Sequence, residues 1–333
     1  MIRLLRVELS RLRARRAVLL LLAAAIIVPA IIAVSTVWST RPPSEAKLAS
    51  VQAQVDSETA RPRTQRTLLE CLEKPQRYGI EASSSDVQAS CEEMVLPQPE
   101  WFYYYEVLDL DQERTSGSGT VVVAVLGVLM FLLGATFVGH DWSTGSMSNQ
   151  LLFQPRRARV WLAKAIAVTL VSLGVAAAVA TAYWLGLTLV LHLRDAPPLD
   201  GALLAALQQG WRGAGFAAAG GLGGYALTML SRSTVFSLGA LFAVSVAGGV
   251  LLGTIGPDDR GMLDPTINAE AIVTDGTEYY VSVPERCYNQ ESLRDDCDDQ
   301  GERSLQQGLA YYGVLVGTVG LASMVSFRRR DVP

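Results

Sequence analysis

The chain has 333 residues, of which 50% are hydrophobic and only 18% are charged, and its mean hydropathy is +0.26. Soluble domains carry a charged fraction nearer a quarter, so this composition argues against a soluble protein and indicates a membrane protein. The formal net charge of −4 at pH 7 is a sum that conceals how the charges are distributed along the chain.

The first sixteen residues contain six arginines and a single acidic residue, Glu8. Leu5, Leu9 and Leu12 recur at helical spacing among the arginines, so we expect residues 1–16 to form an amphipathic helix at the membrane interface. The apolar run that follows is too long for the core of a signal peptide, and no clear A-x-A site comes after it. It is therefore interpreted as a retained membrane span.

A helix needs about 20 apolar residues to cross the hydrocarbon core of a bilayer. Six stretches qualify, and five of them have cores without Asp, Glu, Lys or Arg. The fourth is rich in Gly and Ala and reaches full length only with Gln208, Gln209 and Arg212 at its outer end. The expected spans are residues 17–37, 119–138, 161–192, 203–230, 234–255 and 308–327.

Lys and Arg close to short loops remain on the cytoplasmic side of a membrane. With the N-terminus inside, the six spans place 14 basic and 3 acidic residues on the cytoplasmic side and 14 basic and 29 acidic residues outside. We therefore expect both termini in the cytoplasm of a bacterial cell, with the spans in its plasma (inner) membrane. Residues 139–160 form a cytoplasmic loop, 328–333 a cytoplasmic tail and 193–202 a short outer loop.

Two long segments, residues 38–118 and 256–307, lie outside in this topology. Each contains two of the four cysteines, which on the oxidising side of the membrane indicates disulfides rather than a metal site or a catalytic thiol. Three pairings are possible. We favour the local pairs Cys71–Cys91 and Cys287–Cys297, because each closes a short loop within one segment.

The first outer segment predicts helix over residues 45–72, with an interruption at Pro62. The aromatic run at residues 101–105 fits an interfacial belt or the core of a small outer domain better than a surface that faces substrate. In the second segment, residues 278–283 resemble a strand.

An acidic cluster in the second segment partly matches a calcium-binding loop. Asp296, Asp298 and Gly301 stand at EF-hand positions, but the twelfth position is Gln307, where a bidentate Glu is required. A solvated acidic loop is therefore the preferred interpretation. We expect no metal site.

The sequence contains no phosphate-binding G-x-x-x-x-G-K-[ST] loop, no H-E-x-x-H and no G-x-S-x-G. The two histidines, His140 and His192, fall at opposite membrane boundaries. We therefore expect no catalytic residues, no cofactor and no nucleic-acid partner, and any energy for transport would come from another subunit.

The loop between the second and third spans is the most informative stretch. A short helix is expected to begin near Ser143 or Thr144 and to end at Pro155, followed by a basic patch. An alternative interpretation is a loop whose arginines only contact anionic lipid headgroups. The pattern consists of Asp141, Trp142, Thr144, Gly145, Ser146, Leu151, Leu152, Pro155, Arg156, Arg159 and Lys164.

This pattern, within a six-span topology, resembles the permease subunits of ABC-2 type transporters of the type V exporter kind. Asp141 stands where that family usually has Glu, and Ser146 where it usually has Thr. The resemblance implies that residues 141–154 form a coupling helix, which is received by a separate ATPase subunit that binds ATP and Mg²⁺. It further implies two ATPase copies and a second permease copy or homologue. The resemblance does not extend to the two outer segments.

The expected fold is thus an all-α polytopic membrane protein with an interfacial helix, six spans, a coupling helix and two extracellular disulfide-containing segments. The expected function is export of an amphipathic or hydrophobic substrate such as a lipid, a peptide or a drug-like compound. The alternative is a membrane-anchored sensor or scaffold whose outer segments bind a partner. Arg212 is a candidate for contact with substrate or with an interface, although an interfacial cation more often snorkels to the membrane surface.

Overall fold

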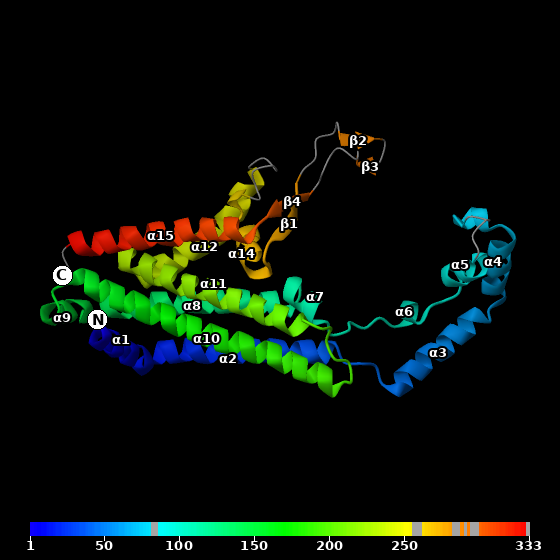
Figure 1. The fold of residues 1–333 in the computed structure, drawn as a ribbon, viewed down its shortest axis with the longest axis horizontal. Coiled ribbons are helices and arrows are strands. Elements are labelled where there is room, and N and C mark those ends of the chain that lie inside the picture. Colours follow the sequence, from blue (N-terminus) through cyan, green and yellow to red (C-terminus); the bar gives the residue numbers. More distant parts are fainter. Residues whose placement is uncertain (81–85, 255–261, 282–286, 290–291, 294–299, 331–333) are drawn as a thin grey trace. The chain divides into compact units, whose positions relative to one another are not determined.

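The computed structural model describes residues 1–80, 86–254, 262–281, 287–289, 292–293 and 300–330 (Figure 1). The chain divides into two compact units. Met1–Ser35 together with Asp109–Pro333 is called the bundle unit, and Thr36–Leu108 is called the insert unit.

Helices of 6 to 37 residues make up most of the bundle unit. They are α1 (Ile2–Ala14), α2 (Arg16–Ser39), α7 (Leu110–Thr115), α8 (Ser118–Ser143), α9 (Ser146–Phe153), α10 (Arg157–Leu193), α11 (Ala202–Ser231), α12 (Thr234–Thr254), α14 (Pro265–Thr274) and α15 (Leu305–Arg329). The last four residues of α2 belong to the insert unit.

Four stretches are long and apolar enough to cross a membrane: α2, Leu110–Ser143, α10 and α15. Their length and composition indicate a membrane protein. α11 has 30 residues but is not among the four. In α12 the apolar stretch whose side chains are described, Thr234–Val244, is too short to count as one. The fourth and fifth of the six expected spans therefore stay predictions.

α11 lies against α8, α10 and α15, and its glycines permit these close contacts. A Cβ atom on Gly224 would collide with the carbonyl oxygen of Phe131, and one on Gly134 of α8 with the carbonyl oxygen of Gly221. A Cβ on Gly220 would come within 3.1 Å of the Gly127 carbonyl oxygen. The low hydropathy of α11 thus has a physical reason, because small residues let two helix backbones approach.

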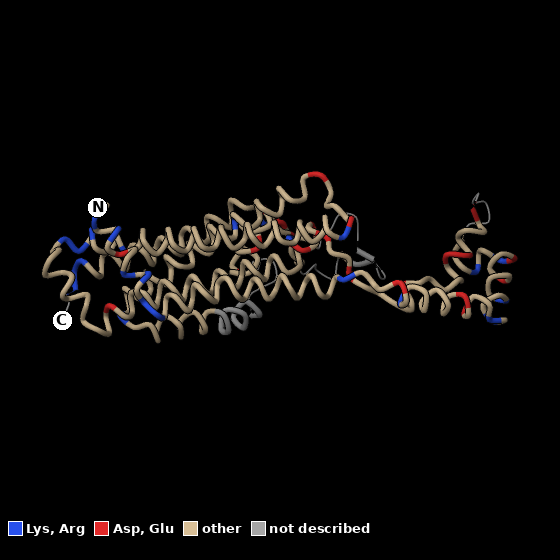
Figure 2. Tube along the Cα trace, turned by 90° about the horizontal axis from the view of Figure 1, so that it is seen from below, with Lys and Arg blue, Asp and Glu red and all other residues tan. Residues whose placement is uncertain are grey.

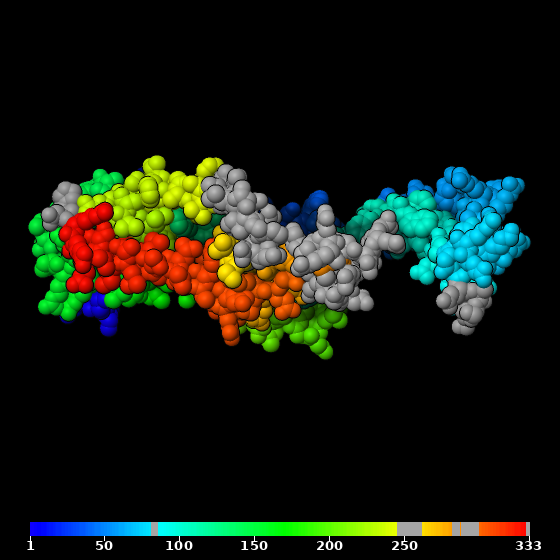
Figure 3. Space-filling model, turned by 90° about the horizontal axis from the view of Figure 1, so that it is seen from above, coloured from blue at the N-terminus to red at the C-terminus, as the bar shows by residue number. Residues whose placement is uncertain are grey.

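α15 lies along one face of the bundle unit (Figure 3). Among its described residues only Gly308, Ser323 and Phe327 are buried. Most of this apolar helix therefore faces outward, as expected of a helix that contacts lipid or a second protein chain.

The chain is mostly helical, but the prediction of an all-α protein is wrong for the second outer segment. Here β1 (Thr277–Tyr280) pairs antiparallel with β4 (Gln300–Arg303), and β2 (Tyr288–Asn289) pairs with β3 (Ser292–Leu293). Tyr279 and Tyr280 favour strand, which explains the location of β1. The strand predicted over 278–283 begins at this place, but residues 282–283 lie outside the described residues.

The insert unit consists of α3 (Glu45–Thr59), α4 (Pro62–Glu73), the short 3₁₀ helix η1 (Pro75–Tyr78), α5 (Val87–Val95) and α6 (Pro99–Phe102). Pro62 occupies the first turn of α4, where a missing N–H costs nothing, so it separates α3 from α4 as predicted. A disulfide joins Cys71 of α4 to Cys91 of α5, and both cysteines are completely buried. The predicted pair Cys71–Cys91 is confirmed.

Cys287 is also disulfide-bonded, whereas its predicted partner Cys297 lies outside the described residues. In the aromatic run, Trp101 is 61% exposed and Tyr104 is 78% exposed. These two side chains do not form a core of the insert unit. Tyr103 and Tyr105 stack on each other with ring centroids 6.2 Å apart.

Removing the disulfide with C71A/C91A should destabilise the insert unit by about 3 kcal/mol, because the bond closes a loop of 20 residues. Limited proteolysis of the purified chain, with and without reductant, measures this as faster cleavage within residues 36–108. Peptide mapping without reduction must recover Cys71 linked to Cys91; any other pairing would contradict the assignment.

Gly224→Ala should lower the melting temperature clearly, because its new methyl group meets rigid backbone of α8, and overpacking of this kind costs at least about 1–3 kcal/mol. Gly223→Ala is the matched control on the same helix, since nothing lies within 4 Å of a Cβ there. Thermal unfolding in detergent compares the two. Equal melting temperatures would disprove the close α8–α11 contact.

Candidate functional site

Lys and Arg gather at the end of the bundle unit where the N-terminus and Arg330 lie, called the basic end here (Figure 2). Its exposed cations are Arg3, Arg6, Arg13, Arg16, Arg156, Arg159, Arg328, Arg329 and Arg330. The two carboxylates that the structure describes at this end, Glu8 and Asp141, are both completely buried. The exposed surface of the basic end is therefore strongly positive.

Lys164 of α10 is a completely buried cation at the basic end. Its Nζ donates to Glu8 Oε2 at 2.8 Å and to Asp141 Oδ2 at 2.6 Å. The Phe137 ring lies beside the ammonium group, with its centroid 5.2 Å from Nζ. One lysine thus links α1 to the end of α8.

Asp141 lies in the last turn of α8 and accepts hydrogen bonds from three different segments. Arg15, between α1 and α2, donates to Oδ1, and Ser146 at the start of α9 donates to the same oxygen at 2.6 Å. Lys164 of α10 donates to Oδ2. This carboxylate therefore fixes the start of α9 relative to α8 and α10.

Glu8 is the corresponding carboxylate on α1. Its Oε1 accepts a hydrogen bond of 2.5 Å from Gln150 Nε2 of α9, and Gln150 Oε1 accepts one of 3.0 Å from Arg11. α1 is therefore tied to α9 through Gln150 and to α10 through Lys164.

Glu8, Arg15, Asp141 and Lys164 form the buried charge cluster, which has two charges of each sign. None of the three completely buried members, Glu8, Asp141 and Lys164, could be buried alone, because an isolated ion loses several kcal/mol of hydration that only a close partner and hydrogen bonds can offset. The cluster therefore requires α1, α8 and α10 to assemble together.

α8 continues past residue 138, where the second span was expected to end, because its last turns carry Asp141 into the cluster. Thr144 then caps the helix, and Gly145 adopts φ +68°, a left-handed conformation that favours glycine. The predicted short helix is present, but it begins at Ser146, because Ser143 and Thr144 end α8.

α9 buries a polar side chain and exposes two large apolar ones. Met147 and Gln150 are buried, while Leu152 is 79% exposed and Phe153 is 87% exposed. Pro155 follows and separates α9 from α10. The result is a short helix with a polar anchor inside and two large apolar side chains outside.

The predicted coupling residues divide into three groups by burial. Asp141 and Lys164 are buried and hold the connection from within, so they offer no surface to a partner. Trp142, Ser146 and Leu151 are partly buried. The exposed members are Thr144, Gly145, Leu152, Pro155, Arg156 and Arg159.

Trp142 packs inside the basic end. Its ring meets Phe327 of α15 edge-on, with centroids 6.2 Å apart, and the Arg232 guanidinium lies 4.8 Å from its centroid. Its Nε1 is buried and has no hydrogen-bond partner among the residues that the structure describes. Trp142 therefore positions α8 against α15 and the turn between α11 and α12.

Glu8, Arg15 and Gln150 are site residues that the sequence patterns did not single out. Glu8 had a signal: it lies three residues after Leu5 and four before Leu12, on the apolar face of the first helix. A lone carboxylate on such a face needs a buried cation. Gln150 had no comparable signal.

Arg212, the candidate for contact with substrate or with an interface, forms an ion pair of 2.7 Å with Asp275 at the end of α14. The pair ties α11 to the second outer segment. It lies away from the basic end, in the first half of α11.

Comparison with protein-family models, curated proteins and solved structures finds no match to this chain.

Lys164→Met should destabilise the bundle unit by roughly 3–5 kcal/mol, because Glu8 and Asp141 would lose their shared cation while they stay buried. Arg159→Met removes an exposed cation at the start of the same helix and should change stability little. Thermal unfolding in detergent gives both values.

Glu8→Gln combined with Lys164→Met tests the pair directly. The double variant should lose less stability than the sum of the single losses, since each single change leaves an uncompensated charge. Additive losses would show that the two side chains do not interact.

Proposed function

We propose that this chain is the membrane subunit of an ATP-driven exporter of the ABC-2 type, and that α9 is the element that receives movement from a separate ATPase subunit. The observation that carries the proposal is the construction of α9. Ser146 and Gln150 bind it to the buried charge cluster, while Leu152 and Phe153 extend into solvent. Large exposed apolar side chains are typical of a surface that binds another protein.

The ATPase groove would receive Leu152 and Phe153, with the cations of Arg156 and Arg159 at its rim. Aromatic and apolar anchors contribute most of the affinity at such interfaces, and rim charges act mainly on the association rate. This chain has no phosphate-binding loop, so ATP and Mg²⁺ would be bound by the partner.

A displacement of α9 would move more than one helix. Ser146 connects it to Asp141 of α8, and Gln150 connects it through Glu8 to Lys164 of α10. In this proposal α9 transmits movement to the second and third spans as a unit, and a cavity between two permease copies opens outward. The abundant Ala, Leu and Val of the spans suit an amphipathic or hydrophobic substrate.

The proposed setting is a bacterial plasma (inner) membrane with both termini in the cytoplasm. The positive basic end supports this orientation, since Arg-rich ends remain on the cytoplasmic side. Two ATPase copies and a second permease copy or homologue would complete the transporter.

A second candidate function is a membrane-anchored scaffold. The exposed Trp101 and Tyr104 of the insert unit favour it, because exposed aromatic side chains are common in binding surfaces. In that case the spans would serve only as an anchor.

Leu152→Ser with Phe153→Ser should abolish co-isolation with the partner ATPase subunit, which this proposal expects to be encoded next to this chain, because the change removes both apolar anchors. Leu193→Ser with Leu199→Ser is the matched control: these side chains are 75% and 83% exposed and belong to the opposite end of the bundle unit. Affinity purification of the co-expressed subunits measures the effect. Unchanged co-isolation, or equal loss in the control, would count against α9 as the coupling element.

A further inference from the structure

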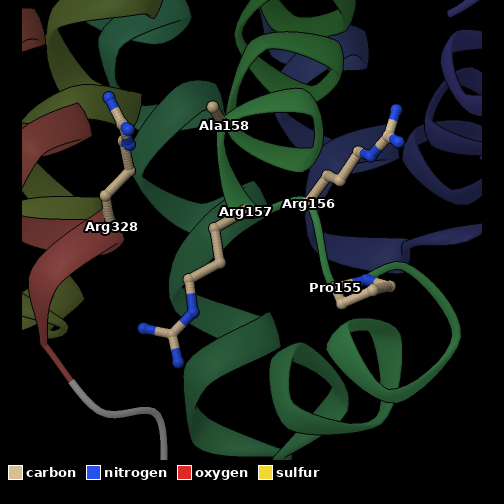
Figure 4. Close-up of a pocket in the computed structure, with 5 residues that line it drawn as sticks. All are labelled: Pro155, Arg156, Arg157, Ala158 and Arg328. Carbon is tan, nitrogen blue, oxygen red and sulfur yellow. The ribbon is translucent and has the colours of Figure 1, made fainter.

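A pocket of about 310 Å³ opens at the basic end, between the start of α10 and the end of α15. Pro155, Arg156, Arg157, Ala158 and Arg328 line it (Figure 4). The two helices pack against each other nearby, where Trp161 Nε1 donates to Ser323 Oγ at 3.1 Å. The pocket is thus built from two elements about 170 residues apart in the sequence.

Three of the five lining residues are arginines, and none is acidic. Arg157 is held in place because its Nη1 donates to the carbonyl oxygens of Phe327, at 3.4 Å, and Arg330. Figure 4 shows Arg157 extending toward α15, whereas Arg156 extends the other way. Arg156 and Arg328 are exposed and form no ion pair with the residues that the structure describes.

No described carboxylate lines the pocket. Glu8 and Asp141 are buried and already bound to Lys164. Among the residues that the structure describes, no carboxylate offsets this positive lining, and an anion is the ligand that the pocket favours. Guanidinium groups bind phosphate oxygens particularly well, because their N–H groups match the spacing of two oxygens.

The helix faces that line the pocket continue as apolar surface. On α10, Leu162 follows Ala158 by four residues and is 41% exposed. On α15, Val325 and Leu321 precede Arg328 by three and seven residues and are 45% and 66% exposed. Residues at these spacings share one face of a helix, so exposed apolar side chains lie next to the arginines on both helices.

We propose that this pocket binds the phosphate-ester headgroup of an anionic phospholipid, whose acyl chains contact the apolar faces of α10 and α15. A free phosphate would use only the arginines, and an acidic protein segment would leave Leu162, Leu321 and Val325 uncovered. A lipid uses both parts. The anionic surface of a bilayer also supplies such headgroups at high local concentration.

The test uses the purified full chain in a neutral detergent, stripped of lipid and then titrated with phosphatidylglycerol or phosphatidylcholine. Native mass spectrometry counts the lipids retained on each chain. The wild-type chain should retain phosphatidylglycerol at a lipid concentration roughly tenfold lower than the one it needs for phosphatidylcholine. A roughly tenfold difference in affinity is expected if phosphatidylcholine lacks about one strong charge contact.

Arg156→Gln with Arg328→Gln should remove this preference, while Arg157 keeps its bonds to α15. The matched control is Arg3→Gln with Arg6→Gln, which removes the same charge from exposed positions on α1. This control should keep the preference for phosphatidylglycerol. Leu162→Ser with Val325→Ser should also weaken retention of phosphatidylglycerol. Unchanged melting temperatures identify variants that remain folded.

Four outcomes would overturn the proposal. The first is full retention of phosphatidylglycerol by the Arg156 and Arg328 variant, and the second is an equal loss of phosphatidylglycerol by the α1 control. The third is displacement of the lipid by millimolar glycerol phosphate, which would indicate a free-phosphate site. The fourth is loss of ATPase co-isolation in the same variant without loss of lipid, which would assign the arginines to a protein partner.

Discussion

The ammonium group of Lys164 is completely buried, and this single charge constrains the whole basic end of the molecule. Burial of a cation is tolerated only beside anions that stay close and well hydrogen-bonded. Glu8 and Asp141 meet that need from two different helices, and Arg15 compensates the second carboxylate. The N-terminal helix is therefore part of the bundle's assembly, and the connection between α8 and α10 has one defined conformation.

The orientation of α9 follows from the same constraint. Ser146 and Gln150 must point inward to reach the two carboxylates, so the apolar residues at the end of this short helix turn outward. An ordinary amphipathic helix would bury Leu152 and Phe153 and expose Gln150. This inversion makes α9 suited to contact a partner, and it places that contact only a few residues from the spans it would move.

The glycines have a comparable effect in the middle of the bundle unit. Gly134 and Gly224 allow α8 and α11 to approach until their backbones touch. α15, in contrast, is largely exposed. An exposed α15 in turn borders the arginine pocket at the basic end. The cost is that α11 is less hydrophobic than a typical span, so length and composition alone do not identify it as one.

The sequence by itself determined the membrane class and the positions of the four helices that are long and apolar enough to cross a membrane, because these depend on local composition. Among three possible cysteine pairings it favoured Cys71–Cys91, because that pair closes a short loop. It also located the connection between the second and third spans and the helix break at Pro155. Only the tertiary structure decided that Asp141 and Lys164 lie inside rather than at a surface, that Glu8 and Gln150 join them, and that Arg328 lines the same pocket as Arg156 and Arg157. These contacts join residues 139 to 173 positions apart, except Asp141 and Lys164, and hydrophobic periodicity carries no information on which buried charges will be partners.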